Sequence, residues 1–470
     1  MGENGSKPEE PMEEMAMLSS LLLIKDTPKR GGKQQKAALL NRLTGAVARV
    51  TIKFITMKSR FPALENPTYR AFFLSQTVSL TGTWMQNLAL PWLAYTLTGS
   101  PFLLGLVGAV QFLPVMLLSL FAGALSDRLV KARVVLATQL ILSLSSALLA
   151  LLVFTHTATY PLLLLVALLL GLANTLDFPA RQAMVGELVG RDLMMNAVAL
   201  NSSVFNAARI VGPAIAGLVM GAWGIGWCFA LNALSFLPTL VVLRRMPRTP
   251  APVRDAQSPD LWHATKDGIA YVRGEKVLRD VLIAVTLMSV LGFNFSVLLP
   301  VLVKQNLGLG ETAYGLLMSF MGVGSFAAAF TIAARSSRGP RVVILTLAPL
   351  VTASLFIGLA FTPWFGLIAA LMVVVGFSNV AFFTTANSVL QIHARPEYRG
   401  RVTAFYSLMF GGMTPIGNLI AGTLVQVGGP SLGFLVTGSA LAACFLFWRI
   451  RSRGESSAPP PSLPPEAPGQ

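Results

Sequence analysis

Twelve apolar segments, each long enough to cross a lipid bilayer, constrain this chain of 470 residues more than any other feature. A helix needs about 20 mostly apolar residues to cross the hydrocarbon, where every peptide group must find its hydrogen-bond partner within the helix. The sequence therefore predicts an all-α membrane protein with twelve transmembrane helices. We place these at residues 70–97, 101–125, 132–154, 160–183, 193–221, 226–246, 279–304, 311–334, 341–361, 364–391, 400–428 and 430–449.

The basic residues are distributed unevenly between the two sides of these segments. Of the 36 Lys and Arg residues, 34 lie in the N-terminal region, alternate connections and the C-terminal region, or at the segment ends that border them. Lys304 is the only one on the opposite side, and Arg209 lies inside the fifth segment. Because cytoplasmic loops carry the positive excess, we expect both termini in the cytoplasm and the protein in the inner (plasma) membrane. The net charge of +16 then reflects topology, which argues against a nucleic-acid partner.

The connections divide the chain into five regions. We expect a basic cytoplasmic N-terminal region (1–66), a six-helix bundle (67–246), a cytoplasmic central loop (247–278), a second six-helix bundle (279–450) and a disordered Pro-rich tail (451–470). Residues 36–61 fit two interpretations that the sequence does not separate. They form an amphipathic helix on the membrane surface, or they precede the true translation start, for example at Met57.

The two bundles repeat one another in sequence. Offsets of 210, 205 and 202 residues align three pairs of helices, and three pairs of residues illustrate them: Gly105 with Gly315, Gly171 with Gly376, and Pro213 with Pro415. Two bundles of like orientation are the plan of a transporter whose halves rock about a substrate site between them.

Two motifs resemble those of the major facilitator superfamily, and the resemblance extends over roughly residues 66–450. The stretch 123–131, GALSDRLVK, begins at Gly123 and resembles the motif between helices 2 and 3, with Val130 where a glycine is usual. The stretch 208–217, ARIVGPAIAG, is similar to the helix-5 signature of exporters and antiporters and contains Gly212, Pro213 and Gly217.

Residues 79–86, 97–101 and 177–182 resemble the subgroup that contains the bacterial enterobactin exporter. This resemblance implies proton-driven efflux of a small molecule by secondary active transport. It also implies that helices 1, 4, 7 and 10 line the central cavity.

Ionisable residues inside a bilayer are costly, so each one indicates a functional site. Asp177 and Arg181 are four residues apart, which places them on one face of a helix. With Asp127, Arg128 and Lys131 of the loop motif, they are our candidates for gating and proton coupling. Asp177 is either the proton carrier, since leaving water favours the neutral carboxylic acid, or half of a permanent structural ion pair with Arg181.

Arg209 lies near the predicted midplane, whereas Asp177 is about 9 Å from the predicted cytoplasmic end of its helix, so we expect no salt bridge between them. Arg209 either contacts an anion or substrate, or packs against carbonyl groups that Pro213 frees. Five amides are further candidates for substrate binding, with interhelical hydrogen bonding as the alternative role: Gln86, Asn87, Asn174, Asn294 and Asn379.

The second bundle lacks the charges of the first. The offsets align Asp127 with Ser337, Asp177 with Phe382, Arg181 with Ala386 and Arg209 with Gly411. We therefore expect the first bundle to hold the gate and the coupling residues, and the second to provide an apolar, amide-lined wall for the substrate.

Other functions remain as alternatives. An importer with the same fold is the nearest, and a polytopic membrane enzyme or a scaffold belongs to another class. The sequence favours no enzyme, because His156, His263 and His393 fall in separate loops and Cys228 and Cys444 lie in separate apolar segments. We therefore expect no cofactor and no metal, and a monomer that exchanges a small-molecule substrate with protons across the lipid bilayer.

Overall fold

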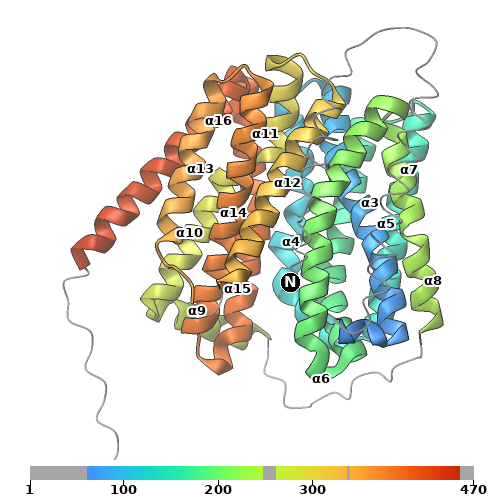
Figure 1. The fold of residues 1–470 in the computed structure, drawn as a ribbon, viewed down its shortest axis with the longest axis vertical. Helices are drawn as coiled ribbons and strands as arrows, with labels where there is room; N and C mark the ends of the chain where they lie inside the picture. The colour runs from blue at the N-terminus through green and yellow to red at the C-terminus, as the bar shows by residue number, and fades with distance from the viewer. Residues whose placement is uncertain (1–60, 247–260, 336–338, 456–470) are drawn as a thin grey trace, which may run out of the picture. The chain divides into compact units, whose positions relative to one another are not determined.

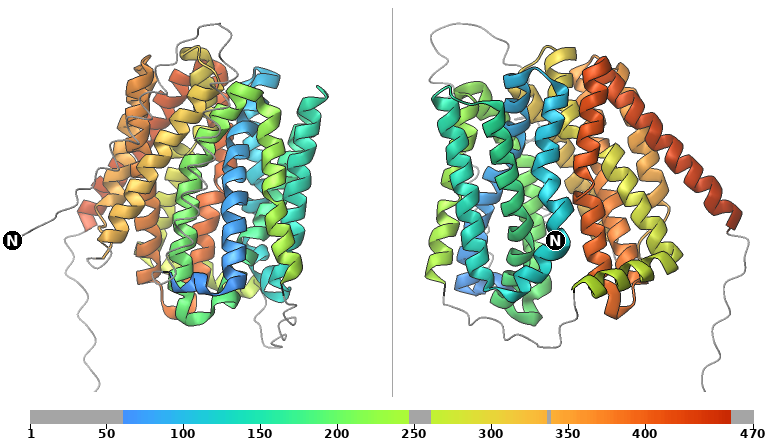
Figure 2. Two further views of the ribbon diagram at one scale, coloured as in Figure 1. Left: turned by 45° about the vertical axis from the view of Figure 1, so that its right-hand side comes forward. Right: turned by 180° about the vertical axis from the view of Figure 1, so that it is seen from behind.

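The computed structural model describes residues 61–246, 261–335 and 339–455, with the backbone alone at 120–128, 191, 261–264 and 450–455. The expected surface helix at 36–61, apart from Phe61, and most of the expected C-terminal tail lie outside these residues. Every regular element in the described part of the chain is a helix. Two sets of helices lie side by side, coloured blue to green and yellow to red in Figure 1 and seen from behind in Figure 2.

The first helix set is α3 (Pro67–Thr98), α4 (Pro101–Arg128), α5 (Lys131–Phe154), α6 (Tyr160–Trp223), α7 (Ile225–Ser235) and α8 (Leu237–Arg245). The second helix set is α10 (Lys276–Gly292), α11 (Phe295–Val301), α12 (Glu311–Ala334), α13 (Ile344–Phe361), α14 (Phe365–His393), α15 (Arg399–Gly411) and α16 (Thr414–Glu455). A short helix, α9 (Leu261–Gly274), lies in the expected central loop and packs on α15, where Asp267 and Arg401 form an ion pair of 3.1 Å.

Ten stretches of these helices are long and apolar enough to cross a membrane, compared with the twelve segments expected. Two features account for the difference. The helix α3 is not among the ten, because polar residues such as Gln76, Gln86 and Asn87 lower its hydropathy. Residues 396–449 count as one stretch although the backbone turns at Gly428 and Gly429. Large apolar side chains in mid-helix are exposed, as lipid contact requires; Leu144 is 61% and Phe330 is 68% exposed.

Local sequence determines where the helices begin and end. The side-chain oxygen of Asn66 accepts hydrogen bonds from the backbone N–H groups of Thr68 and Tyr69, which caps α3. The helix ends at Gly99, whose φ of 63° is readily adopted only without a side chain. Gly224, Gly308 and Gly429 turn with similar angles at the same end of the helices, which we call the Gly99 end.

A further glycine turn lies at the opposite end, which we call the Gly190 end. Gly190 has φ 75° and ψ 175°, so the long element α6 consists of two helices joined by a tight turn. The fourth helix therefore extends to this turn and not to residue 183 as expected. Asp177 consequently lies about 20 Å along the helix from its end, and not the expected 9 Å.

Close contacts at glycines reproduce the repeat in three dimensions. A Cβ atom on Gly171 would clash with the carbonyl oxygen of Gln111, and one on Gly376 with that of Met321. Gln111 and Met321 are 210 residues apart, and Gly171 and Gly376 are 205 apart, as the offsets for these helices require. The expected equivalence of helices 2 and 4 with helices 8 and 10 is therefore present in the packing.

The offset for the fifth helix differs from the expected one. Gly315 packs against Gly217 and the carbonyl of Pro213, whereas Gly105 packs against Gly422 and the carbonyl of Asn418. These contacts make Pro213 equivalent to Asn418, at an offset of 205, and not to Pro415. The expected alignment was three residues out of register, which is nearly one helical turn, and Arg209 is equivalent to Thr414 and not to Gly411.

These contacts predict different effects for two Gly→Ala substitutions. Gly376→Ala forces a methyl group onto the backbone of α12, and overpacking of this kind costs about 1–3 kcal/mol or more. Gly358→Ala in α13 meets no atom within 4 Å, so it should be neutral or slightly stabilising. The apparent melting temperature of the purified protein in detergent should fall for the first variant only. Equal melting temperatures would contradict the packing of α12 on α14.

Candidate functional site

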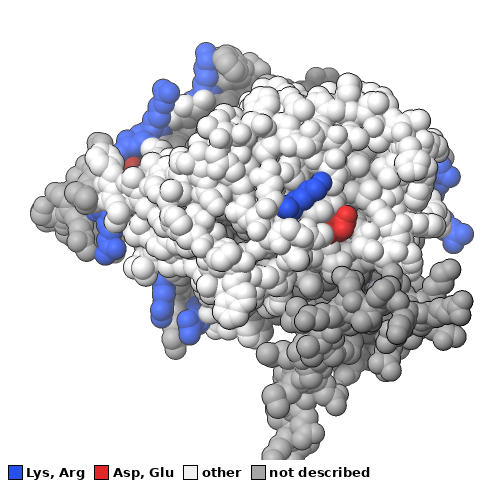
Figure 3. Space-filling view, turned by 90° about the horizontal axis from the view of Figure 1, so that it is seen from above, with Lys and Arg blue, Asp and Glu red and all other residues white. Residues whose placement is uncertain are grey.

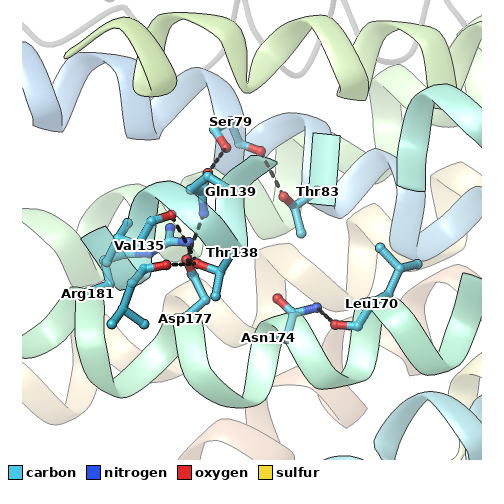
Figure 4. Close-up of polar contacts among 10 residues, drawn as sticks. Ser79, Thr83, Val135, Thr138, Gln139, Leu170, Asn174, Asp177 and Arg181 are labelled. Atoms are coloured by element: carbon cyan, nitrogen blue, oxygen red, sulfur yellow. Dashed lines mark hydrogen bonds and ion pairs between the residues drawn. The ribbon is translucent and has the colours of Figure 1, made fainter. Parts of the chain in front are cut away.

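The Asp177 carboxylate is the centre of a buried polar cluster in the first helix set (Figure 4). Its Oδ1 atom accepts hydrogen bonds from Thr138 Oγ1 at 2.7 Å and Gln139 Nε2 at 3.0 Å, both on α5. Its Oδ2 atom forms an ion pair with Arg181, one turn further along α6, as the spacing of four residues predicts. Asp177 is only 3% exposed, so these partners replace the water that it loses.

Gln139 extends this cluster to a third helix. Its Oε1 atom accepts a hydrogen bond of 3.4 Å from Ser79 on α3, while its amide nitrogen donates to Asp177. The cluster therefore joins α3, α5 and α6 through side chains. A change in the charge of Asp177 would alter hydrogen bonds to all three helices.

The loop-motif residues lie at the Gly190 end. Lys131 begins α5 and forms an ion pair of 3.2 Å with Glu187 near the end of the fourth helix. Val130, which occupies the usual glycine position, has φ −67° and ψ 108°, so this turn does not require a glycine. Gly123, Asp127 and Arg128 belong to α4, in the stretch whose side chains lie outside the description.

Gln86 belongs to a second buried cluster in the first helix set. Its Oε1 atom accepts hydrogen bonds from Ser146 on α5 at 2.6 Å and from Asn232 on α7 at 2.8 Å. Asn232 also donates to Ser146 and accepts from Ser235. In this conformation the carbonyl oxygen of Gln86 is therefore occupied by two neighbouring helices.

The other candidate amides differ in their surroundings. Asn87 is exposed, and Asn174 donates a hydrogen bond to the carbonyl of Leu170 on its own helix. Asn294 lies at a break between α10 and α11 and Asn379 lies within α14; each is at most 1% exposed and donates to a carbonyl of the preceding turn. The Oδ1 atoms of Asn294 and Asn379 are buried without a partner among the described residues.

Arg209 is in the middle of the fifth helix, about 26 Å along the helix from Asp192 and 21 Å from Trp223. Its guanidinium carbon lies 5.8 Å from the centre of the Trp84 ring on α3. Its Nε atom is buried without a hydrogen-bond partner in the described part of the chain. Asp177 is paired with Arg181, and no salt bridge joins it to Arg209. The expected reason for this, a shallow Asp177, is wrong, because Asp177 lies about 20 Å from the end of its helix.

The motif residues Gly212, Pro213 and Gly217 bring helices close together. Gly212 lies against the Trp84 Cβ atom and the carbonyl of Thr81, which allows the fifth helix to pack closely on α3. Gly217 packs on Gly315 of α12 in the second helix set. The signature thus places the helix that carries Arg209 against both helix sets.

Comparison with known families decides the class of this chain. Residues 58–464 match the family described as transmembrane secretion effector, which is a family of major facilitator type. The chain belongs to the transmembrane secretion effector family. It is therefore a multi-pass membrane transporter of major facilitator type, as its motifs indicated.

Similar proteins include a transporter named for its siderophore and two proteins named for efflux or export. The staphyloferrin A transporter of Staphylococcus aureus is 25% identical over 384 residues, covering 81% of this chain and 96% of that protein. The multidrug efflux pump Tap of Mycolicibacterium fortuitum is 27% identical over 363 residues, covering 75% and 88%. The enterobactin exporter EntS of Shigella boydii is 26% identical over 198 residues, covering 41% and 47%.

Solved structures of the same fold are more distant in sequence. The nucleoside transporter NupG superimposes with a TM-score of 0.64 at 15% identity and covers 83% of this chain and 100% of that chain. A bacterial homologue of the human lysosomal transporter Spinster gives 0.62 at 14% identity and covers 82% and 96%. These similarities concern the fold alone.

Several contacts of this transmembrane secretion effector were missed by the sequence analysis. Thr138 and Gln139 are the partners of Asp177, and the signal for them was a polar pair within an apolar segment. Glu187, the partner of Lys131, gave no signal beyond its charge. Asn418 was also missed; it is fully buried, and both of its side-chain polar atoms lack partners among the described residues.

The Asp177 cluster predicts a non-additive pair of substitutions. Asp177→Asn keeps the acceptor for Thr138 and Gln139 but leaves Arg181 without a counter-charge, and breaking a buried ion pair costs about 3–5 kcal/mol. Arg181→Gln likewise leaves the Asp177 carboxylate without a counter-charge. The double variant removes both charges and should melt closer to the wild type than the sum of the single losses predicts. Additive shifts in apparent melting temperature would show that the two charges do not stabilise one another.

Proposed function

We propose that this chain is a secondary active transporter that exports small molecules across the inner membrane in exchange for protons. The similarity to the multidrug efflux pump Tap over 75% of the chain, and to the enterobactin exporter EntS over 41%, is the main support for export. The fold supports transport by alternating access, in which two halves rock and open a central site first to one side and then to the other. The transporter acts as a monomer in this proposal.

Twelve transmembrane helices arranged as two halves fit the helix lengths. Residues 396–449 would form a helix of about 80 Å, which is far longer than a bilayer, and the turn at Gly428 and Gly429 divides them into two spans. The 32 residues of α3 suffice for a span of their own, because polar side chains such as Gln86 and Ser79 pair with residues inside the first helix set. With the basic connections on the cytoplasmic side, the Gly99 end faces outward and both termini face inward.

Contacts across the Gly99 end support a conformation that is closed on the outside. Trp92 Nε1 donates to Glu311 Oε1 at 3.3 Å, and the Trp92 ring stacks on Tyr314 at 5.6 Å. Ser100, in the turn before α4, donates to Gln426 of α16 at 2.8 Å, which joins the two helix sets at the same end. Figure 3 views this end, whose described central surface consists mostly of residues other than Lys, Arg, Asp and Glu.

Glycine contacts between the two helix sets supply surfaces on which the halves can rock. The α6–α12 contact is made by Gly217 and Gly315, and the α4–α16 contact by Gly105 and Gly422. Surfaces without side chains have nothing to interlock, so a small rotation does not require neighbouring side chains to be displaced. Hydrogen bonds such as Trp92–Glu311 then decide which end is closed.

Coupling to protons is assigned to the Asp177 cluster. Its protonation would weaken the ion pair with Arg181 and turn one carboxylate oxygen into a donor, which changes the hydrogen bonds to α5 and α3. Lys131, with Asp127 and Arg128, holds the Gly190 end as a gate in this proposal. Arg209, Gln86, Asn87, Asn174, Asn294 and Asn379 remain the proposed substrate contacts.

Proteoliposomes with an imposed pH gradient test export and proton coupling. A screen of lipophilic dyes, antibiotics and siderophores should identify a compound that moves against protons, and its addition should drive proton movement. Asp177→Asn should reduce this proton movement to background, whereas Asp192→Asn should not, since Asp192 is an exposed carboxylate near Gly190. Full substrate-driven proton movement in Asp177→Asn would make the carboxylate structural. Compound and protons moving in the same direction would identify an importer.

Alternating access predicts that locking the Gly99 end stops transport. In a background without Cys228 and Cys444, cysteines at Ser100 and Gln426 lie where the two side chains now share a hydrogen bond. A short, reducible bifunctional reagent should cross-link them, abolish transport, and allow its recovery on reduction. Each single-cysteine variant is the control for modification alone. Undiminished transport by the cross-linked protein would show that this end does not open.

A further inference from the structure

Arg209 carries a charge in the middle of a membrane helix that no described residue neutralises. It forms no salt bridge or hydrogen bond through its side chain with the described residues, and its Nε atom is buried. A packing role would need hydrogen bonds from the guanidinium to carbonyl groups freed by Pro213, and the described structure contains none. The guanidinium therefore keeps its donors available in this conformation.

The interaction with Trp84 does not offset the loss of water. A cation over an aromatic ring gains about 0.5–2 kcal/mol, whereas desolvation of an ion costs several kcal/mol even after the protein relaxes. The buried carboxylate of Asp177, in contrast, has a full set of partners. This difference indicates that the missing partner of Arg209 comes from outside the chain.

Aromatic side chains flank the free guanidinium. The Trp84 ring meets the Phe205 ring edge to face, with centroids 5.6 Å apart, and Phe205 is one helical turn before Arg209. Phe205 remains 43% exposed, and Arg209 itself is partly exposed, so a ligand can approach both. Asn87, which is exposed one turn after Trp84 on α3, adds an amide on the same face.

We infer that Arg209, Trp84 and Phe205 form the part of the substrate site that selects aromatic organic anions, with the anionic group on Arg209 and a ring against Trp84 and Phe205. This inference rests on the proposed function, because it names the substrate class for the same site. A sulfonate or carboxylate fits the free guanidinium, which donates paired hydrogen bonds to such groups. The ring supplies an apolar surface that an inorganic anion lacks.

Binding measurements with a matched pair of dyes test this inference. Anilinonaphthalene sulfonate and its uncharged parent, phenylnaphthylamine, differ by the sulfonate group alone, and both become fluorescent when bound. With the full chain in lipid nanodiscs and empty nanodiscs subtracted, the anion should bind more tightly than its parent. Arg209→Gln should weaken anion binding about tenfold to a hundredfold, as expected for a hydrogen-bonded charge, and leave the parent within about twofold.

Three further variants separate a binding role from a structural one. Arg209→Lys keeps the charge and should retain a preference for the anion. Trp84→Leu should weaken the binding of both dyes. Arg133→Gln removes an exposed positive charge at the Gly190 end and should change neither.

The inference is overturned if Arg209→Gln binds the anion as the wild type does, or if the wild type binds neither dye. If Arg209→Gln loses both dyes, a retained preference in Arg209→Lys supports the inference, and a lost preference overturns it. The assay is independent of coupling, so bound anions that are not exported from proteoliposomes would refute the proposed function and leave this assignment standing.

Discussion

Close approach of helix backbones is the interaction on which the rest of this structure depends. Lipid chains are as apolar as leucine, so burying apolar surface does not drive membrane helices together, and packing at small residues takes its place. Gly171 against Gln111 and Gly376 against Met321 bring helices so close that a methyl group would meet a carbonyl oxygen. Once these contacts fix the helices, side chains such as Asp177 and Thr138 come within hydrogen-bonding distance.

The two helix sets share this packing but differ in charge. In the glycine contacts, Gly212 lies against Trp84 and Gly417 lies against Asn294, so Trp84 and Asn294 occupy equivalent places. Arg209 is likewise equivalent to Thr414, which is buried and donates to the carbonyl of Phe410 on its own helix. The first helix set therefore carries a cation and an aromatic ring, Arg209 and Trp84. At the equivalent places the second helix set carries a small hydroxyl and an amide, Thr414 and Asn294. In the proposed transport cycle, a substrate between them would meet chemically different walls, which would favour one orientation.

Hydropathy was sufficient to locate the apolar helices, because lipid imposes a minimum length on each of them. It failed at α3, whose polar side chains face neighbouring helices, and could not locate the Gly190 turn, since helical sequence continues on both sides. The Asp177–Arg181 pair was predictable because it depends only on the helical repeat. The partners Thr138 and Gln139 depend on the register between two helices, which a single sequence does not encode locally. The same limitation explains the wrong alignment of Pro213 with Pro415, where residue identity suggested one register and packing set another.

Asp177, which is paired, and Arg209, which has no partner among the described residues, lie on the two halves of α6, separated by the turn at Gly190. They make no direct contact, so any influence of one on the other must pass through a third helix. The helix α3 touches both: Ser79 donates to Gln139 in the Asp177 cluster, and the ring of Trp84, five residues later, lies 5.8 Å from the Arg209 guanidinium carbon. An anion bound to Arg209 would neutralise the uncompensated charge that lies against α3. Protonation of Asp177 would weaken the hydrogen-bonded connection between Asp177 and α3. If substrate and protons are exchanged as proposed, α3 is the helix that would connect the two sites, because it contacts both.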